Sequence, residues 1–253
     1  MSRFYVETPH RMGDEIEISG AEARHIQRVL RLKEGDEIVL FDGKGMEYWG
    51  TIESLRFHRV TVKIGKTNTP QRESPIDIIL GQGLLKGDKM DYVYQKSTEM
   101  GIAAIFPFIS SSTIPIVSGE RAERRRSRWE RIVLESAKQC GRTVPPRVEG
   151  IRDFRSILES PFHGFAKLIL WEKEETTLRE RMREIDENSR KFLFLVGPEG
   201  GFCDMEISAA KGRGFIPVGL GPRILRSETV AVAMLSILHY EFGDWGPYPA
   251  SPL

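Results

Sequence analysis

Two glycine-rich stretches in the C-terminal part of the chain decide how its fold is interpreted. The first is Leu195-Val196-Gly197-Pro198-Glu199-Gly200-Gly201-Phe202, and the second is Gly219-Leu220-Gly221-Pro222-Arg223-Ile224-Leu225-Arg226-Ser227-Glu228-Thr229. Each follows an apolar run and precedes a segment with helical periodicity, so each is expected to connect a strand to a helix. Glycine and proline at this density bend the backbone and let a ligand approach without interference from Cβ atoms.

Either stretch alone is also compatible with a tight turn that binds nothing. Two such turns favour a binding site, because open parallel sheets bind ligands at the carboxyl ends of their strands. Backbone groups of the second stretch can meet a flat heterocycle, with apolar walls from Leu220, Ile224 and Leu225. The nucleotide motifs fit less well: Gly81-Gln82-Gly83-Leu84-Leu85-Lys86 has lysine where the dinucleotide fingerprint needs its third glycine, and no P-loop motif occurs.

Apolar runs that alternate with amphipathic segments predict an α/β domain around these stretches. The expected strands are Ile76–Leu80, Ile102–Ile109, Ala166–Trp171, Lys191–Gly197 and Phe215–Leu220. The expected helices include Thr229–Tyr240 and, most clearly, Glu120–Cys140, which ends at Gly141. Strands separated by crossover helices indicate a mainly parallel sheet that is buried on both faces.

The N-terminal part of the chain shows a different pattern. Short β-type runs occur at Arg3–Val6, Glu37–Phe41, Met46–Glu53 and Val60–Ile64. One helical segment, Ala21–Leu32, interrupts them, and a linker rich in proline and polar residues follows. We therefore expect a small β-barrel domain at residues 1–71 and the α/β domain at residues 72–253.

Composition limits the classes of protein to consider. With 253 residues, 40% hydrophobic and 29% charged, the chain has ordinary globular composition. Its longest apolar stretch, Val230–Leu238, is far shorter than the roughly 20 residues of a membrane span, and the N-terminus lacks a signal-peptide core, so we expect a cytoplasmic protein. Cys140 and Cys203 have neither disulfide-framework nor zinc spacing, and no metal is expected. A net charge of +1 means that any RNA site must be a local patch.

Several segments, in order, resemble the bacterial RsmE family. They are Glu22-x-x-His25-x-x-x-Val29-Leu30-Arg31-x-x-x-Gly35-Asp36, Lys86-Gly87-Asp88-Lys89-Met90-Asp91, Gln95-Lys96-x-x-Glu99-x-Gly101, Gln139-x-x-Arg142-x-x-x-Pro146 and both glycine-rich stretches. The resemblance covers nearly the whole chain, and the pair of glycine-rich stretches is its most specific part. Departures are small: Ser227 stands where threonine is common, and Met100 where leucine is usual.

That resemblance implies both a fold and an activity. The RsmE family methylates N3 of a uridine in 16S ribosomal RNA of the small subunit and belongs to the SPOUT methyltransferases. For the fold, the resemblance implies a PUA-like β-barrel followed by a trefoil-knotted α/β domain, and a homodimer. For the activity, it implies S-adenosyl-L-methionine as cofactor and the 30S subunit or its RNA as substrate. The knot follows from the resemblance alone, because knots are too rare to infer from sequence patterns.

The resemblance also implies which residues hold the cofactor, through backbone contacts and apolar packing. They are Leu170, Trp171, Gly197, Pro198, Glu199, Gly200, Gly219, Leu220, Gly221, Ile224, Leu225, Arg226 and Thr229.

Uracil N3 must lose a proton before it can accept a methyl group, so a base and a cation are needed as catalytic residues. Arg226 is the candidate for stabilising the charge that develops on the carbonyl oxygens. Glu228 or Glu199 is the candidate base, if burial raises the pKa of either carboxyl toward neutrality. Glu228 has a second interpretation as a carboxylate favoured at a helix start by the macrodipole.

For RNA binding, the N-terminal candidates are Arg3, Arg11, Arg24, Arg28, Arg31 and Lys33. Three of them, Arg24, Arg28 and Arg31, share one helix face, which favours a cluster over a merely solvated surface. An arginine-rich run at residues 121–131 is denser, but glutamates dilute it and solvated helices often have this pattern.

Three alternatives remain open from the sequence. The same reaction could act on transfer RNA or on another ribosomal site, which would leave every cofactor residue unchanged. An RNA-binding assembly factor without catalysis would keep the basic patch but would not need both glycine-rich stretches. A nucleotide-dependent oxidoreductase is disfavoured by Lys86 in the dinucleotide fingerprint.

Overall fold

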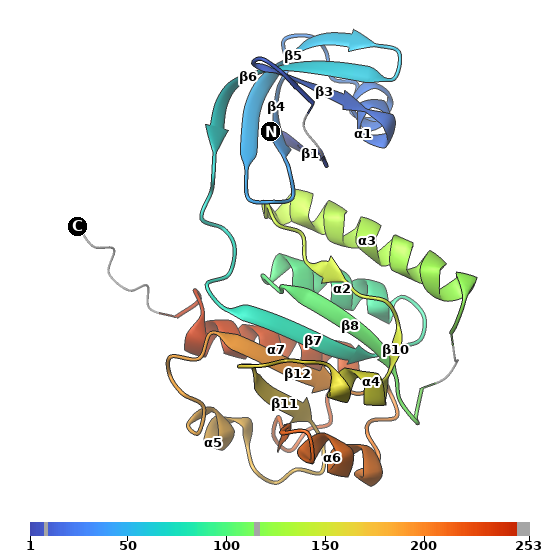
Figure 1. Ribbon diagram of the computed structural model, residues 1–253, viewed down its shortest axis with the longest axis vertical. Coiled ribbons are helices and arrows are strands. Elements are labelled where there is room, and N and C mark those ends of the chain that lie inside the picture. The colour runs from blue at the N-terminus through green and yellow to red at the C-terminus, as the bar shows by residue number, and fades with distance from the viewer. Residues whose placement is uncertain (8–9, 114–116, 247–253) are drawn as a thin grey trace, which may run out of the picture. The chain divides into compact units, whose positions relative to one another are not determined.

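The computed structural model describes residues 1–7, 10–113 and 117–246, without the side chains of residues 10–12 (Figure 1). It divides into two compact units, Met1–Glu73 with Leu134–Pro145, and Ser74–Val133 with Pro146–Leu253. The first unit thus includes the expected residues 1–71 and also the end of a long helix far along the chain, which the sequence patterns did not indicate.

Unit 1 contains a curled six-stranded sheet that forms a half-barrel (Figure 1). In spatial order the strands are β1 (Ser2–Tyr5), β4 (Glu37–Phe41), β5 (Glu47–Arg56), β6 (Arg59–Asn68), β3 (Glu15–Ser19) and β2 (His10–Met12). Only β1 and β4 pair in parallel. Alternate residues such as Ile16, Ile18, Val60 and Val62 point into one apolar core, as the period of two requires.

The helical segment of unit 1 is less regular than expected. Instead of one helix at Ala21–Leu32, α1 spans Gly20–Arg24 and continues as a π-helical turn, η1, at His25–Val29. The backbone N–H of Leu30 donates to His25 O (3.0 Å), and Arg31 then ends the segment with φ +53°. The wider turn keeps Ile26 in the core and leaves the apolar Val29 69% exposed.

Unit 2 contains the expected parallel sheet. Its order is β10 (Arg152–Asp153), β8 (Ala104–Ile109), β7 (Asp77–Gly83), β12 (Lys191–Val196), β11 (Ala166–Leu170) and β13 (Ile216–Val218), with β9 (Arg147–Val148) also paired to β8. Every pairing in this sheet is parallel. The five predicted strands correspond to β7, β8, β11, β12 and β13, with ends that differ by a few residues.

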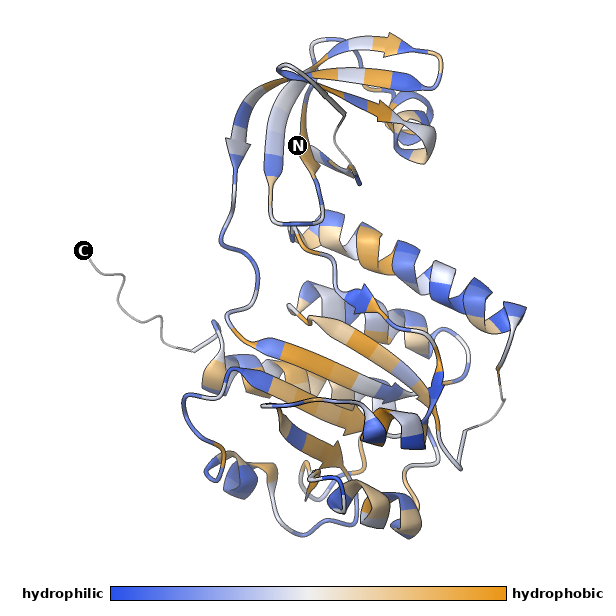
Figure 2. Ribbon diagram, in the orientation of Figure 1, coloured by the Kyte–Doolittle hydropathy of each residue, from blue (hydrophilic) through white to orange (hydrophobic). Residues whose placement is uncertain are grey.

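Helices cover both faces of this sheet. They are α2 (Lys89–Glu99), α3 (Glu120–Cys140), α4 (Phe154–Glu159), α5 (Leu178–Met182), α6 (Asp204–Lys211) and α7 (Ser227–Phe242). In β12, Phe192 and Phe194 pack with α2 and α7, whereas Leu193 and Leu195 pack with α4 and α6. Because both faces are buried, the central strands are apolar along most of their length, as Figure 2 shows for β12 and β7, where hydrophilic residues lie only toward the strand ends.

Candidate functional site

One cavity of about 740 Å³ is lined by both glycine-rich connections. Residues 196–202 follow β12, and residues 220–228 lead from β13 into α7; the end of β11 contributes Leu170 and Trp171. All three segments lie at the carboxyl ends of neighbouring parallel strands, where ligands bind in such sheets. The two stretches that the sequence singled out therefore form one site.

Close packing and hydrogen bonds hold the two connections together at the end of β7. A Cβ atom on Gly83 would lie 2.5 Å from the backbone nitrogen of Pro198, so glycine is required for this approach. Buried Gln82 donates through Nε2 to Ser227 Oγ (2.9 Å), and Ser227 Oγ donates to Gly197 O (2.6 Å). This chain of buried hydrogen bonds fixes the start of α7 against the first connection.

The second connection leaves its backbone polar groups available. No hydrogen bond within the described part of the chain uses an N–H or C=O group of residues 220–225. Ile224 in the same segment is 86% exposed, although its side chain lines the cavity. Unused donors and acceptors beside apolar side chains suit the edges and face of a flat heterocycle.

Most of the expected cofactor residues lie around this cavity. Those that line it are Leu170, Trp171, Gly197, Pro198, Glu199, Gly200, Leu220, Gly221, Ile224, Leu225 and Arg226. Two do not line it. Gly219 pairs with the segment before α5, donating to Thr176 O and accepting from Leu178 N–H, and Thr229 is an exposed residue in the first turn of α7.

Glu199 is bound to the start of α2. Its Oε1 accepts from the backbone N–H of Lys86 (3.0 Å) and from Lys89 Nζ (3.1 Å). Partial burial raises the pKa of this carboxyl, but the two hydrogen bonds outweigh burial and hold the pKa of Glu199 below its ordinary value. The condition attached to Glu199 as a base, a pKa raised by burial, is therefore not met, and its carboxylate instead ties the first connection to α2.

Glu228 lies in the first turn of α7 with its side chain 14% exposed. Its Oε2 atom is buried and forms no hydrogen bond with any described residue, while Lys89 Nζ lies 3.9 Å away. The carboxylate occupies a helix start, and it also lines the cavity. It therefore presents an unused acceptor beside the place where a ligand would lie.

Lys89 is a site residue that the sequence analysis missed. Its ammonium group lies between the carboxylates of Glu199 and Glu228 and so joins the two connections. A signal was present, because Lys89 is the first residue of α2, where the helix macrodipole disfavours a cation. A lysine at such a position indicates partner carboxylates, but their identity depends on the fold.

Arginine side chains complete the charged surface of the cavity. Arg226 and Arg223 both line it and are exposed. Neither guanidinium forms an ion pair with another residue in the described ranges. Arg226 precedes α7 directly as its N-cap residue, next to the buried Ser227 and close in sequence to Glu228.

The RNA-binding candidates have different surroundings. Arg24, Arg28, Arg31 and Lys33 are exposed. Arg3 is largely buried, pairs with Glu47 and donates to the carbonyls of Gly141 and Arg142, so its charge is used inside unit 1. The side chain of Arg11 lies outside the described residues.

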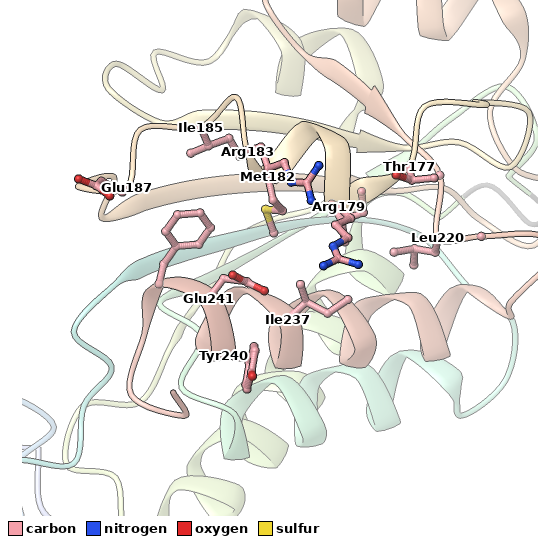
Figure 3. A pocket seen from close by; sticks show the side chains of 14 residues that line it. Thr177, Arg179, Met182, Arg183, Ile185, Glu187, Leu220, Ile237, Tyr240 and Glu241 are labelled. Atoms are coloured by element: carbon pink, nitrogen blue, oxygen red, sulfur yellow. The ribbon is translucent and has the colours of Figure 1, made fainter. Parts of the chain in front are cut away.

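A second cavity, of about 930 Å³, lies between α5 and α7 (Figure 3). Arg179, Met182, Ile237 and Tyr240 are among its lining side chains. It shares Leu220 and Gly221 with the first cavity, but Glu199, Arg226 and Glu228 line only the first. The three side chains that the sequence suggested for catalysis therefore line the cavity between the two connections and not the second cavity.

The described residues form neither a metal-binding cluster nor a membrane-spanning helix. Among them, no group of three or more histidine, cysteine, aspartate or glutamate side chains is arranged to hold a metal ion. Within the same ranges, no helix combines the length and apolar character needed to cross a membrane.

Comparison with known proteins places this geometry in a family. Residues 72–239 match the family described as the RNA methyltransferase domain, and residues 18–65 match the RNA methyltransferase PUA domain. The ribosomal RNA small subunit methyltransferase E of Bacillus subtilis (strain 168) is 30% identical over 95% of this chain and 97% of its own length.

Solved structures agree with the sequence matches. The ribosomal RNA small subunit methyltransferase E from Neisseria gonorrhoeae, bound to S-adenosylmethionine, has a TM-score of 0.87 and 36% identity over 97% of this chain and 99% of that one. A Legionella pneumophila protein in complex with the same cofactor has a TM-score of 0.88 and 33% identity over 96% and 98% of the two chains. The expected fold class, a SPOUT-type α/β domain after a PUA-like unit, is confirmed. The chain belongs to the ribosomal RNA small subunit methyltransferase E family, the RsmE family of RNA methyltransferases.

Proposed function

We propose that this protein transfers a methyl group from S-adenosyl-L-methionine to N3 of a uridine in 16S ribosomal RNA, in the cytoplasm. The observation that carries the proposal is the single cavity built by both glycine-rich connections. A non-catalytic RNA-binding protein would have no need for this construction, and the dinucleotide fingerprint is absent.

The cavity suits the cofactor in size and in chemistry. The unused backbone groups of residues 220–225 can meet the donor and acceptor edges of adenine, while Leu170, Leu220 and Ile224 supply apolar contacts. Trp171 lines the same cavity, and its Nε1 donor is buried without a hydrogen-bond partner among the described residues. When bound, the cofactor supplies an electrophilic sulfonium methyl group.

Within this site, Glu228 accepts the proton of uracil N3. Its Oε2 is the carboxylate oxygen that no described residue uses as a hydrogen-bond acceptor. Loss of the proton spreads negative charge onto the uracil carbonyl oxygens, and the unpaired guanidinium of Arg226 donates to one of them. Glu199 does not share this role, because Lys86 and Lys89 already hold its carboxylate; it acts as a positioning residue.

The two units have different roles in the reaction. The α/β unit binds the cofactor and carries the catalytic residues, and the PUA-like residues 1–71 hold the RNA through Arg24, Arg28, Arg31 and Lys33, whose exposure supports this role. The substrate is 16S RNA, free or within the 30S subunit.

The protein acts as a homodimer. Tyr92 on α2 and Tyr240 on α7 are exposed, and these two helices pack together, which supports a dimer surface on the α/β unit.

The test combines two measurements on the full chain. Calorimetry with S-adenosylmethionine reports whether the cavity binds the cofactor. Labelled cofactor is then incubated separately with small ribosomal subunits, large subunits and transfer RNA, and mass spectrometry locates any modified nucleotide. We expect cofactor binding and one N3-methyluridine in the small-subunit RNA. Cofactor binding with modified transfer RNA would transfer the proposal to another substrate, and absence of cofactor binding would refute it.

A further inference from the structure

The tip of the β5–β6 hairpin carries an aromatic side chain that lies outside the apolar core of unit 1. The turn is Arg56-Phe57-His58-Arg59, and Phe57 is 82% exposed. Two-residue hairpin turns favour glycine, asparagine and aspartate, which accept left-handed backbone angles at low cost. Here His58 takes φ +62°, so the turn places a ring where a smaller residue would fit more easily.

The tip is held in a defined position. Gln27 donates through Nε2 to Arg56 O (2.8 Å) and Arg59 O (3.0 Å), and these bonds fasten the turn to the π-helical segment η1, beside α1 (Figure 1). The His58 ring packs edge-on against Phe57 with centroids 3.8 Å apart. A ring fixed in this way loses little conformational freedom when a partner stacks on it.

Arginines flank the turn in sequence and lie along the helical segment to which Gln27 fastens it. The guanidinium groups of Arg28 and Arg56 are exposed and form no ion pair with another described residue. Arg24 and Arg31 on the same helical segment are likewise exposed and unpaired in the described ranges. Carboxylates are also near: Glu17 pairs with Arg59, and Glu34 accepts from the backbone N–H of Leu55. Arg59 thus balances the charge of Glu17 and Glu34 keeps its own charge, whereas Arg24, Arg28, Arg31 and Arg56 remain available to an anionic partner.

We propose that Phe57 is a stacking platform for an unpaired base of the RNA substrate, with the neighbouring arginines on the flanking phosphates. An open aromatic face beside free guanidinium groups matches the two parts of a single-stranded nucleotide, its base and its phosphate. Duplex RNA does not fit, since its bases already stack on one another. The inference deepens the proposed function and rests on RNA being the substrate.

The test compares Phe57→Ala and Phe57→Trp with Met205→Ala, a control at a side chain of equal exposure on α6. The affinity of each full-length variant is measured for a short single-stranded RNA of mixed sequence and for a duplex of the same length. Phe57→Ala is expected to weaken single-strand binding by about 5- to 100-fold, Phe57→Trp to restore it, and neither to change duplex binding. Met205→Ala is expected to bind like the unaltered protein.

The salt dependence of RNA affinity distinguishes base stacking on Phe57 from arginine contacts with phosphates. Phe57→Ala is expected to leave the slope of log affinity against log salt unchanged, whereas Arg28→Gln reduces it by about one unit. The proposal is overturned if Phe57→Ala binds single-stranded RNA as tightly as the unaltered protein does. It is also overturned if the variant loses affinity for duplex RNA to the same extent as for single-stranded RNA. A loss seen only with intact small subunits would also overturn it, because the tip would then contact a ribosomal protein.

Calorimetry with S-adenosylmethionine distinguishes a wrong role for Phe57 from a wrong activity for the protein. In the first case Phe57→Ala binds RNA normally while the protein still binds S-adenosylmethionine in calorimetry. In the second case the unaltered protein does not bind the cofactor.

Discussion

The two connections that form the cavity are built differently. Residues 196–202 are held on several sides: Pro198 packs against Gly83, Gly197 accepts from Ser227, and Glu199 is bound by Lys86 and Lys89. Residues 220–225 make no hydrogen bonds within the described chain, and Ile224 is largely exposed. The first connection is thus preformed, and the second keeps its polar groups for a ligand. We infer that the first provides rigidity, and that the second, with the start of α7, provides contacts and chemistry.

The largest expected effect comes from the start of α7. Glu228→Gln removes the proton acceptor but keeps the shape of the side chain, so methyl transfer at neutral pH should fall by about 100- to 10,000-fold. Cofactor affinity in calorimetry should change little. Glu241→Gln, an exposed carboxylate near the end of α7, is the control. Full turnover by Glu228→Gln would remove Glu228 as the base and leave the helix-start interpretation.

Arg226→Ala removes the positively charged side chain at the N-cap of α7. Removal of one preorganised donor to a developing oxyanion lowers kcat by about 100- to 1,000-fold in comparable sites. Cofactor binding and methyl transfer are measured separately, as for Glu228. A loss confined to cofactor binding would assign Arg226 to the cofactor rather than to the reaction.

The next effect should come from the rigid connection. In Gly83→Ala the new Cβ meets the backbone of Pro198, which must shift, and cofactor affinity should fall by about tenfold or more. Gly150→Ala is the matched control, because a Cβ there has open space and the backbone angle is ordinary. Equal cofactor affinity in the two variants would show that the position of Pro198 does not matter for binding.

The smallest effect concerns pH. The lowered pKa of Glu199 means that its contribution to stability is present above the ordinary carboxyl pKa and is lost as pH falls through the lower folded value. The hydrogen bonds from Lys86 and Lys89 to the Glu199 carboxylate should therefore persist at pH 5. Lys89→Met removes one of the hydrogen bonds that lower this pKa, so cofactor affinity should decline from a higher pH than in Lys96→Met. If cofactor affinity has the same pH dependence in Lys89→Met and Lys96→Met, Lys89 does not help to hold the first connection in place.

Elements with strong local patterns were predicted closely. Helix α3 has the predicted bounds, Glu120–Cys140, because an apolar face and Gly141 define it locally. The segment after Gly20 was predicted as one helix, but the structure has a π-helical turn there, since the core position of Ile26 overrides regular spacing. Arg3 was predicted at the RNA surface and instead pairs with Glu47, a partner that local pattern does not reveal.

By itself the sequence determined the family, the alternation of strands and helices, and the two places where the backbone bends sharply. These follow from residue types and periods within short windows. The tertiary structure decided that Gln82, Ser227 and Gly197 meet, and that Lys89 lies between Glu199 and Glu228. The physical reason is the strand order, which places β7 beside β12 and brings side chains together across large separations in sequence, where local propensities carry no information.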